Sequence, residues 1–352
     1  MSRPPYPVRM ATTEARSIPA PSTDVQAGRP ATEVSLTRVG VQGVEKVIKV
    51  AAAPGNDGTP GDGQLYFAEL ECMVDLNPQQ AGVHMSRFEE VVNEAIDGVV
   101  LDQTLRAEEL AGRIAEQVRL RQDGLRAEVT VAARYPETVS TPVSGIQTQE
   151  IYTLFGTAVA SERGTRTLTG VEAHGMTACP CAQGLLADSA RERLVADGFG
   201  DDEIERIFEA VPVATHNQRG IGSLHIGRPE GADVDLDARD LLQIVESSMS
   251  SEIYELMKRS DEAAVVEKAH LQPRFVEDVV REMVRRVAEA FPHLRDGAYL
   301  LARQENLETI HRHSVVAERS GELAEILTEL DSGEHSRHHV TKREWLEEPC
   351  AG

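Results

Sequence analysis

Hydrophobic and polar positions alternate in the first patterned part of the chain. Residues 35–50 alternate with an irregularity near Gly43, which predicts a strand with a β-bulge. A loop rich in Gly, Asp and Pro follows over residues 54–63, and residues 64–75 are predicted to form the returning strand. Residues 1–34 are rich in Pro, Ser, Thr and Ala and lack hydrophobic periodicity, so we expect a disordered or extended arm there.

The pattern then changes to a helical period. Ser86 is expected to cap a helix whose apolar positions run to Ile96, and a second helix is predicted over residues 105–121. Two further strands are predicted at residues 125–135 and 149–160. Residues 35–161 therefore form a first half with the order β-β-α-α-β-β.

The second half, residues 162–320, repeats this order approximately. It contains a predicted strand (165–177), a charged helical region (188–211) broken at 198–202, a strand (220–227), helices (237–258, 261–270 and 273–290) and a pair of strands within 299–317. We therefore expect an α+β protein built from two similar halves. The tail, residues 321–352, is acidic and polar, and we interpret its His335, His338 and His339 as solvated side chains.

Composition limits the class of partner. The chain of 352 residues has 36 basic and 58 acidic side chains and a net charge of −22, so nucleic acid and anionic membranes are not expected partners. Only five of the basic residues are lysine and few residues are aromatic, which favours a protein adapted to high salt; ordinary acidity is the alternative. No apolar stretch approaches the roughly 20 residues that span a bilayer.

Four cysteines in a chain of this length do not form a disulfide framework. They are Cys72, Cys179, Cys181 and Cys350, and Cys72 lies within a predicted strand, where a buried packing role is expected. Reduced thiols indicate a soluble cytoplasmic protein.

Cys179 and Cys181 flank Pro180 at the end of the strand predicted over 165–177. Because proline does not fit a central strand position, we expect the strand to end there and enter a loop. An isolated pair of this spacing is a weak signal, and packing is the alternative.

Other metal-ligand types follow at long separations. His216 supplies an imidazole and Glu252 a carboxylate, so with Cys179 they offer one soft, one intermediate and one hard donor. Such a set suits Zn(II) or Fe(II) without distinguishing them. Each also has a plain structural interpretation: His216 as part of a polar turn, Glu252 as an exposed helix residue, and His311 with His313 as surface residues of a strand.

Two glutamates are notable for their positions. Glu252 is predicted near the edge of the buried face of the 237–258 helix, where a carboxylate is costly unless it is paired or binds a ligand. Glu267 lies beside Lys268 and Glu262, a pattern that also fits a solvated helix face.

Seven segments in the same order resemble the metal-dependent GTP cyclohydrolases of the archaeal MptA type, which are similar to the bacterial type IB enzymes. The segments are residues 35–46, 84–88, 179–181, 216–219, 251–259, 275–278 and 308–313. The resemblance implies a tunnelling fold (T-fold), with helices on one face of the sheet in each half. It also implies that subunits assemble into a barrel-like homotetramer with active sites at subunit interfaces.

The resemblance also implies residue roles. Cys179, His216 and Glu252 would bind the metal, Glu267 would anchor the guanine edge or assist proton transfer, and His311 and His313 would lie near the reacting ring. Cys181 would be a thiol behind the ligands. Arg38, Arg87 and Arg219 are candidate triphosphate contacts because guanidinium groups match phosphate oxygens; salt bridges are the alternative.

The implied reaction is hydrolytic opening of the guanine imidazole ring. Metal-bound water would attack C8 of GTP, and His311 or Glu267 would transfer protons as formate leaves. The long segment between Cys179 and His216 resembles the archaeal members, which use Fe(II) and yield 7,8-dihydroneopterin 2′,3′-cyclic phosphate; Mn(II) or Zn(II) could replace Fe(II). The alternatives are a type IB-like enzyme that keeps the triphosphate, a nitrile reductase-like T-fold enzyme, and a structural zinc protein.

Overall fold

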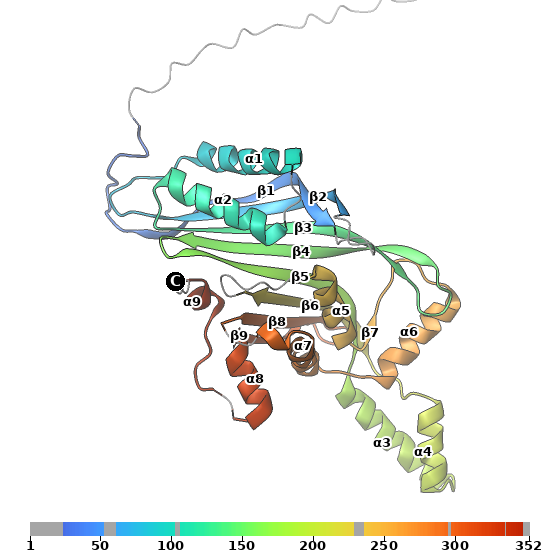
Figure 1. The fold of residues 1–352 in the computed structure, drawn as a ribbon. Helices are drawn as coiled ribbons and strands as arrows, with labels where there is room; N and C mark the ends of the chain where they lie inside the picture. Colours follow the sequence, from blue (N-terminus) through green and yellow to red (C-terminus); the bar gives the residue numbers. More distant parts are fainter. Residues whose placement is uncertain are drawn as a thin grey trace, which may run out of the picture.

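The computed structural model describes residues 24–52, 61–102, 106–228, 236–294, 297–334 and 336–347 (Figure 1). The predicted arm up to residue 23, the loop over 54–60, His335 and Cys350 lie outside these residues. Residues 24–34 form an irregular segment that is hydrogen-bonded to the chain before the first helix, since the Gly28 carbonyl accepts from Ala81 N–H at 2.8 Å. This part of the predicted arm is therefore an ordered loop.

One antiparallel sheet forms the centre of the molecule. Its strands are β1 (Leu36–Ala52), β2 (Gly61–Leu76), β3 (Arg126–Ser140), β4 (Gln147–Ser161), β5 (Gly164–Ala178), β6 (Asn217–Gly227), β7 (Ser251–Glu252), β8 (Tyr299–Leu307) and β9 (Val315–Glu322). The spatial order is β1-β2-β3-β4-β5-β6-β8-β9, and β7 pairs with the end of β5. The α+β class is confirmed.

The helices interrupt the strands in a repeated order. They are α1 (Met85–Asp102), α2 (Ala107–Gln122), α3 (Pro180–Ala196), α4 (Asp201–Ala210), α5 (Ala238–Ser248), α6 (Arg259–Leu271), α7 (Val276–Ala290), the 3-10 turn η1 (Pro292–Leu294), α8 (Leu323–Ser332) and α9 (Lys342–Glu347). The first half is β1-β2-α1-α2-β3-β4, and the second repeats it as β5-β6-α5-α7-β8-β9. The second half has α3 and α4 inserted between its first two strands, and β7 and α6 inserted between α5 and α7.

The main core lies between one face of the sheet and the helices. Successive side chains of a strand point to opposite faces, so Val129 and Val131 of β3 pack toward α2, while Leu224 of β6 packs toward α5. The helix α2 approaches β4 so closely that a Cβ on Gly156 would lie 2.1 Å from the backbone of Ala107. Figure 1 shows α1 and α2 over the first half and α5 and α7 over the second.

The predicted bulge in β1 is confirmed. The pairing of β1 with β2 shifts register between Val41 and Val44, and Gly43 there has a φ of 70°. Glycine adopts this left-handed conformation without the steric cost that other residues meet.

The tail is more structured than its polar composition predicted. The indole of Trp345 in α9 is completely buried on the sheet face opposite the helices, against Tyr299. A Cβ on Gly227 would lie 2.5 Å from this indole, so the sheet is hollowed at that glycine to admit it. Burial of one large aromatic side chain stabilises the folded position of this segment, although the residues around it are polar.

Four local predictions were wrong. The helix predicted over 237–258 ends at Ser248, and Glu252 lies in β7 instead. No loop follows β5, because α3 begins at Pro180. His311 and His313 lie in the loop between β8 and β9, not on a strand, and Ser86 lies inside α1 instead of capping it.

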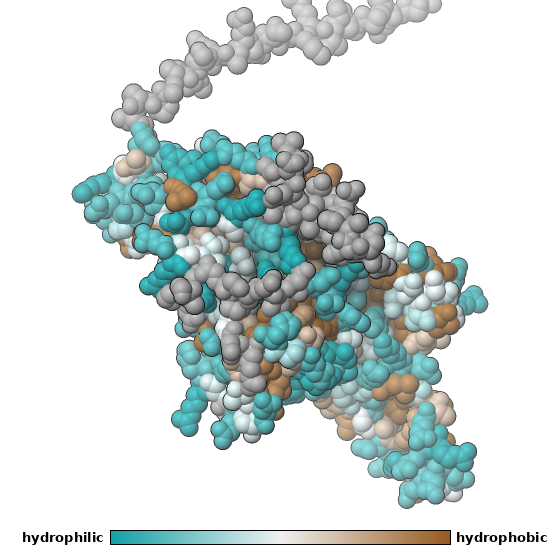
Figure 2. All heavy atoms as spheres, viewed as in Figure 1, coloured by the Kyte–Doolittle hydropathy of each residue, from teal (hydrophilic) through white to brown (hydrophobic). Residues whose placement is uncertain are grey.

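The helices α3 and α4 form a hairpin that projects from the body (Figure 1). Large apolar side chains of this hairpin are exposed, among them Leu185, Leu186 and Val195. Figure 2 shows a mainly hydrophilic surface on the viewed face, with hydrophobic areas on the side that carries these helices. Within the part of the chain that the structure describes, no helix is long and apolar enough to cross a membrane.

Candidate active site

A cavity of about 250 Å³ lies where β5 ends and β6 begins. It is lined by Cys179, His216, Gln218, Arg274, Phe275, Val276, Glu277, Asn306, Glu308, His311, His313 and Val315. Four of the predicted site residues, one thiol and three imidazoles, therefore share one cavity.

Cys179 occupies the N-cap position of α3. Its Sγ accepts from the backbone N–H of Ala182 at 3.5 Å, and Pro180 fills the first helical position. Backbone N–H groups at a helix N-terminus favour negative charge, so this position suits a thiolate. Cys181, two residues further along, is exposed on the first turn of α3.

The backbone joins Cys179 directly to His216. The Cys179 N–H donates to the His216 carbonyl at 3.1 Å, and the Thr215 hydroxyl donates to the Cys179 carbonyl at 2.9 Å. These bonds close the base of the α3–α4 hairpin and hold the two candidate ligands side by side, although the hairpin separates them in the sequence.

The imidazole of His216 has polar neighbours on one side. Its Nδ1 lies 3.1 Å from Oε1 of Gln218 and 3.9 Å from a carboxylate oxygen of Glu308. The amide nitrogen of Gln218 donates to the hydroxyl of Thr177 at 2.9 Å. Gln218 and Thr177 were not predicted as site residues, although Gln218 lies in the segment 216–219.

His311 and His313 form the outer wall of the cavity. Their rings stack with centroids 5.1 Å apart and planes 19° apart. The loop that carries them is tied to β6, because the Thr309 hydroxyl donates to the Asn217 carbonyl at 3.0 Å.

The carboxylates of the cavity are Glu277 and Glu308, neither of which was predicted. Glu277 lies in the first turn of α7, and Glu308 follows the end of β8 with only 8% of its side chain exposed. Both lie in segments that carried the family resemblance, but their sequence neighbours do not distinguish them from other glutamates. Their place in the cavity depends on the pairing of β8 with β6 and on the packing of α7 against β8.

The two glutamates predicted from sequence lie elsewhere. Glu252 pairs across the strands with Gly175 and forms an ion pair with Lys268, and Glu267 is exposed on α6. Neither lines this cavity. Among the described residues, no three His, Cys, Asp or Glu side chains lie close enough together to hold a metal ion.

The predicted phosphate contacts are also outside the cavity. Arg38 forms an ion pair with Glu71, Arg87 donates to the Arg121 carbonyl at 3.0 Å, and Arg219 is exposed on β6. The arginine of the cavity is Arg274, whose backbone N–H donates to the Ala178 carbonyl at 3.0 Å.

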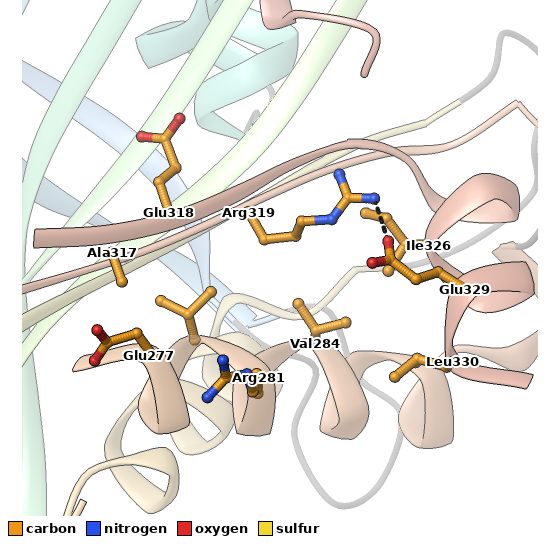
Figure 3. A pocket seen from close by; sticks show the side chains of 10 residues that line it. Glu277, Arg281, Val284, Ala317, Glu318, Arg319, Ile326, Glu329 and Leu330 are labelled. Atoms are coloured by element: carbon orange, nitrogen blue, oxygen red, sulfur yellow. Dashed lines mark hydrogen bonds and ion pairs between the residues drawn. The ribbon is translucent and has the colours of Figure 1, made fainter. Parts of the chain in front are cut away.

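A second cavity, of about 400 Å³, lies between α7, β9 and α8 (Figure 3). Its floor is apolar, with Val284 and Ile326, and Glu277 lines both cavities. Arg319 at its rim is paired with Glu329, as the dashed line in Figure 3 shows, so this charge is already neutralised within the chain.

Solved structures similar to this chain include uricases. The uricase from Arthrobacter globiformis has a TM-score of 0.47 at 10% identity, with 87% of this chain and 98% of the uricase covered. A hyper-thermostable uricase mutant has a TM-score of 0.49 at 11% identity, with 82% and 92% covered.

Sequence relatives are much closer. A family described as type I GTP cyclohydrolase folE2 matches residues 23–317. The protein named GTP cyclohydrolase MptA from Methanococcus vannielii is 39% identical, with 88% of this chain and 99% of the relative covered, and that from Methanocaldococcus jannaschii is 37% identical, with 88% and 98% covered. The chain therefore belongs to the family of type I GTP cyclohydrolases that contains these MptA proteins.

Proposed function

We propose that this chain converts GTP into 7,8-dihydroneopterin 2′,3′-cyclic phosphate with release of formate and diphosphate. Membership of the family supports this reaction, since the relatives are named GTP cyclohydrolase MptA. The observation that carries the proposal is the cavity in which Cys179 and His216 are joined by a backbone hydrogen bond and lie beside His311 and His313.

A divalent transition metal fits the donors of this cavity in part. A thiol at a helix N-terminus and a neighbouring imidazole are ligands that Zn(II) and Fe(II) accept, and we propose Fe(II), with Mn(II) and Zn(II) as alternatives. Cys179 and His216 would hold it, and Glu252 would join them only by leaving its ion pair with Lys268. When bound, such a metal supplies Lewis acidity and makes water a nucleophile at neutral pH.

The histidines and carboxylates of the cavity supply the remaining chemistry. Imidazole suits proton transfer near neutral pH, so His311 and His313 would move protons to and from the guanine imidazole ring as it opens. Glu277 or Glu308 would accept the N1–H and 2-amino hydrogens of guanine. Glu267 lies on the exposed side of α6, so we assign it to the cavity of a neighbouring copy.

We further propose a homotetramer in the cytoplasm of a cell with high internal salt. The exposed apolar side chains of α3 fit a contact between copies, and screening by salt would relieve the repulsion within a chain of net charge −22. Arg274 would contact the triphosphate within one chain, and Arg38, Arg87 and Arg219 would reach it from neighbouring copies.

The test is an anaerobic assay in molar salt. Metal is removed, GTP is added with Fe(II), Mn(II) or Zn(II), and formate and the pterin product are measured by mass. We expect metal-dependent formate release that Cys179→Ala abolishes and that the exposed matched control Cys181→Ala retains. The product mass distinguishes the cyclic phosphate from the triphosphate.

Two results would contradict this proposal. A folded protein that releases no formate with any metal would not be a cyclohydrolase, and NADPH-dependent nitrile reduction would then be measured. Loss of folding on metal removal would instead indicate a structural zinc site.

A further inference from the structure

We propose that Gln218 is a positioning residue that orients His216 and sets which of its ring nitrogens binds metal. The inference rests on the metal site proposed above and extends it to a side chain that lies behind the ligand. It concerns the three residues Thr177, Gln218 and His216.

The strand register places these residues together. Thr177 of β5 and Gln218 of β6 are direct cross-strand partners, and both side chains are buried. The amide nitrogen of Gln218 donates to the Thr177 hydroxyl, and its Oε1 lies 3.1 Å from Nδ1 of His216. Thr177 stands two positions before Cys179, so the same contact ties the strand that leads to the thiol to the ring of the histidine.

The chemistry of the amide decides the tautomer. An amide oxygen can only accept a hydrogen bond, so Nδ1 must carry the proton of the neutral imidazole. The other nitrogen, Nε2, then keeps its lone pair. A histidine that binds metal presents one such lone pair and donates its other N–H to a neighbouring acceptor.

Glu308 supports the same tautomer independently. Its carboxylate oxygen lies 3.9 Å from Nδ1, and a carboxylate favours a proton at the nearest nitrogen. A reversed amide would direct its NH₂ group at Nδ1, move the proton to Nε2 and remove the lone pair there, but it would not change the effect of Glu308.

The experiment measures metal binding directly on the full-length chain. Co(II) is titrated into metal-free protein in competition with a chelator, and the thiolate-to-Co(II) charge-transfer band is recorded. Gln218→Met should weaken Co(II) binding about 10–100-fold, the range seen when partners of a metal-bound histidine are removed. Gln218→Glu should bind within a few-fold of wild type, because a carboxylate also accepts from Nδ1–H. Thr177→Val should give an intermediate loss, because the amide is then held at one end only.

Gln122→Met is the matched control. Gln122, at the end of α2, is as buried as Gln218, and its amide nitrogen donates to the His84 carbonyl. Its replacement should lower the stability of the protein but leave Co(II) affinity and the spectrum unchanged. Folding of each variant is checked by circular dichroism. A folded Gln218→Met that binds Co(II) as wild type does would overturn the inference, as would a Gln218→Glu variant that binds as weakly as Gln218→Met. A wild-type chain that binds no Co(II) would instead overturn the metal site itself.

Discussion

His225 lies on β6 with its Nδ1 buried, and among the described residues this nitrogen has no hydrogen-bond partner. Its ring packs against Phe155 at 5.3 Å and above Gly170, where a Cβ would lie 2.1 Å from the ring. Burial, together with the smaller effect of the nearby Lys342, lowers the pKa of His225 to about 3. The side chain is therefore neutral in the folded protein throughout the physiological pH range.

This histidine should make the protein sensitive to acid. In the unfolded chain His225 takes up a proton near pH 6.5, whereas in the folded chain it does so only near pH 3. The free energy of unfolding therefore has its full value above about pH 6.5 and decreases as the pH falls. The loss should reach up to about 1.4 kcal/mol per pH unit. His225→Leu should remove this dependence in urea titrations between pH 7 and 4, whereas the exposed control His293→Leu should keep it. Equal slopes in wild type and His225→Leu would refute the assignment.

Sequence alone identified the thiol and the imidazoles of the cavity but not its carboxylates. Pro180 carried an available signal, since proline is frequent at the first position of a helix, and it was interpreted only as the end of a strand. Glu277 and Glu308 carried no such signal, because their position depends on contacts between segments far apart in the chain.

At the scale of elements, α9 is the clearest case of a short helix held by one side chain. The Trp345 indole N–H donates to the Gly297 carbonyl at 3.1 Å, and the Arg166 guanidinium lies 4.8 Å from the ring centroid. Arg166 also donates to the Trp345 carbonyl at 2.7 Å. A helix of six residues has little stability of its own, so these contacts hold it in place.

Removing the indole should therefore destabilise the whole chain. We expect Trp345→Ala to lower the free energy of unfolding by about 3–5 kcal/mol, the usual cost of truncating a buried aromatic side chain. Urea titration measures this, and Leu330→Ala, at a half-exposed position of the same tail, should change it by less than about 0.5 kcal/mol. Similar stability of the two variants would show that α9 does not contribute to the fold.

The end of α5 shows what periodicity misses. Apolar positions continue past Ser248 with helical spacing, which led to the prediction of a helix to residue 258. The hydroxyls of Ser247 and Ser248 donate to the carbonyls of Gln243 and Ile244 one turn earlier, at 2.6 Å each. Serine competes in this way with the helix backbone, so a run of serines is a better guide to the helix end than the hydrophobic pattern.

For the whole molecule, Asp261 joins the two halves. This buried carboxylate in the first turn of α6 accepts from the backbone N–H groups of Val143 and Ser144, in the turn between β3 and β4, at 2.9 and 2.8 Å. It also accepts from the Ser144 hydroxyl at 2.6 Å and from the Lys258 N–H at the start of its own helix. Burial would raise the pKa of Asp261, but these hydrogen bonds outweigh it and hold the pKa well below the usual range.

Asp261→Asn should weaken this contact between the two halves. A carboxylate whose pKa is lowered by folding contributes fully to the free energy of unfolding above the pKa that it has in the unfolded chain, near 3.9. This contribution is lost as the pH falls below that value. The melting temperature of Asp261→Asn should therefore lie below that of wild type at pH 7, and the difference should narrow below pH 4. Asp278→Asn is the control, because Asp278 caps α7 from a more exposed position. If Asp278→Asn lowered the melting temperature as much as Asp261→Asn does, Asp261 would have no special role in holding the two halves together.

The hydrogen bonds that tie Cys179 to Thr215 and His216 have a consequence for how this protein can change in evolution. They close the chain at the base of the α3–α4 hairpin. The distance between the two candidate ligands, Cys179 and His216, therefore does not depend on the length or sequence of the hairpin. Lengthening a closed loop costs little free energy, since each doubling adds only about 0.6 kcal/mol. The hairpin can therefore grow, shrink or acquire a new surface by insertion and deletion while the chemistry at its base is inherited unaltered.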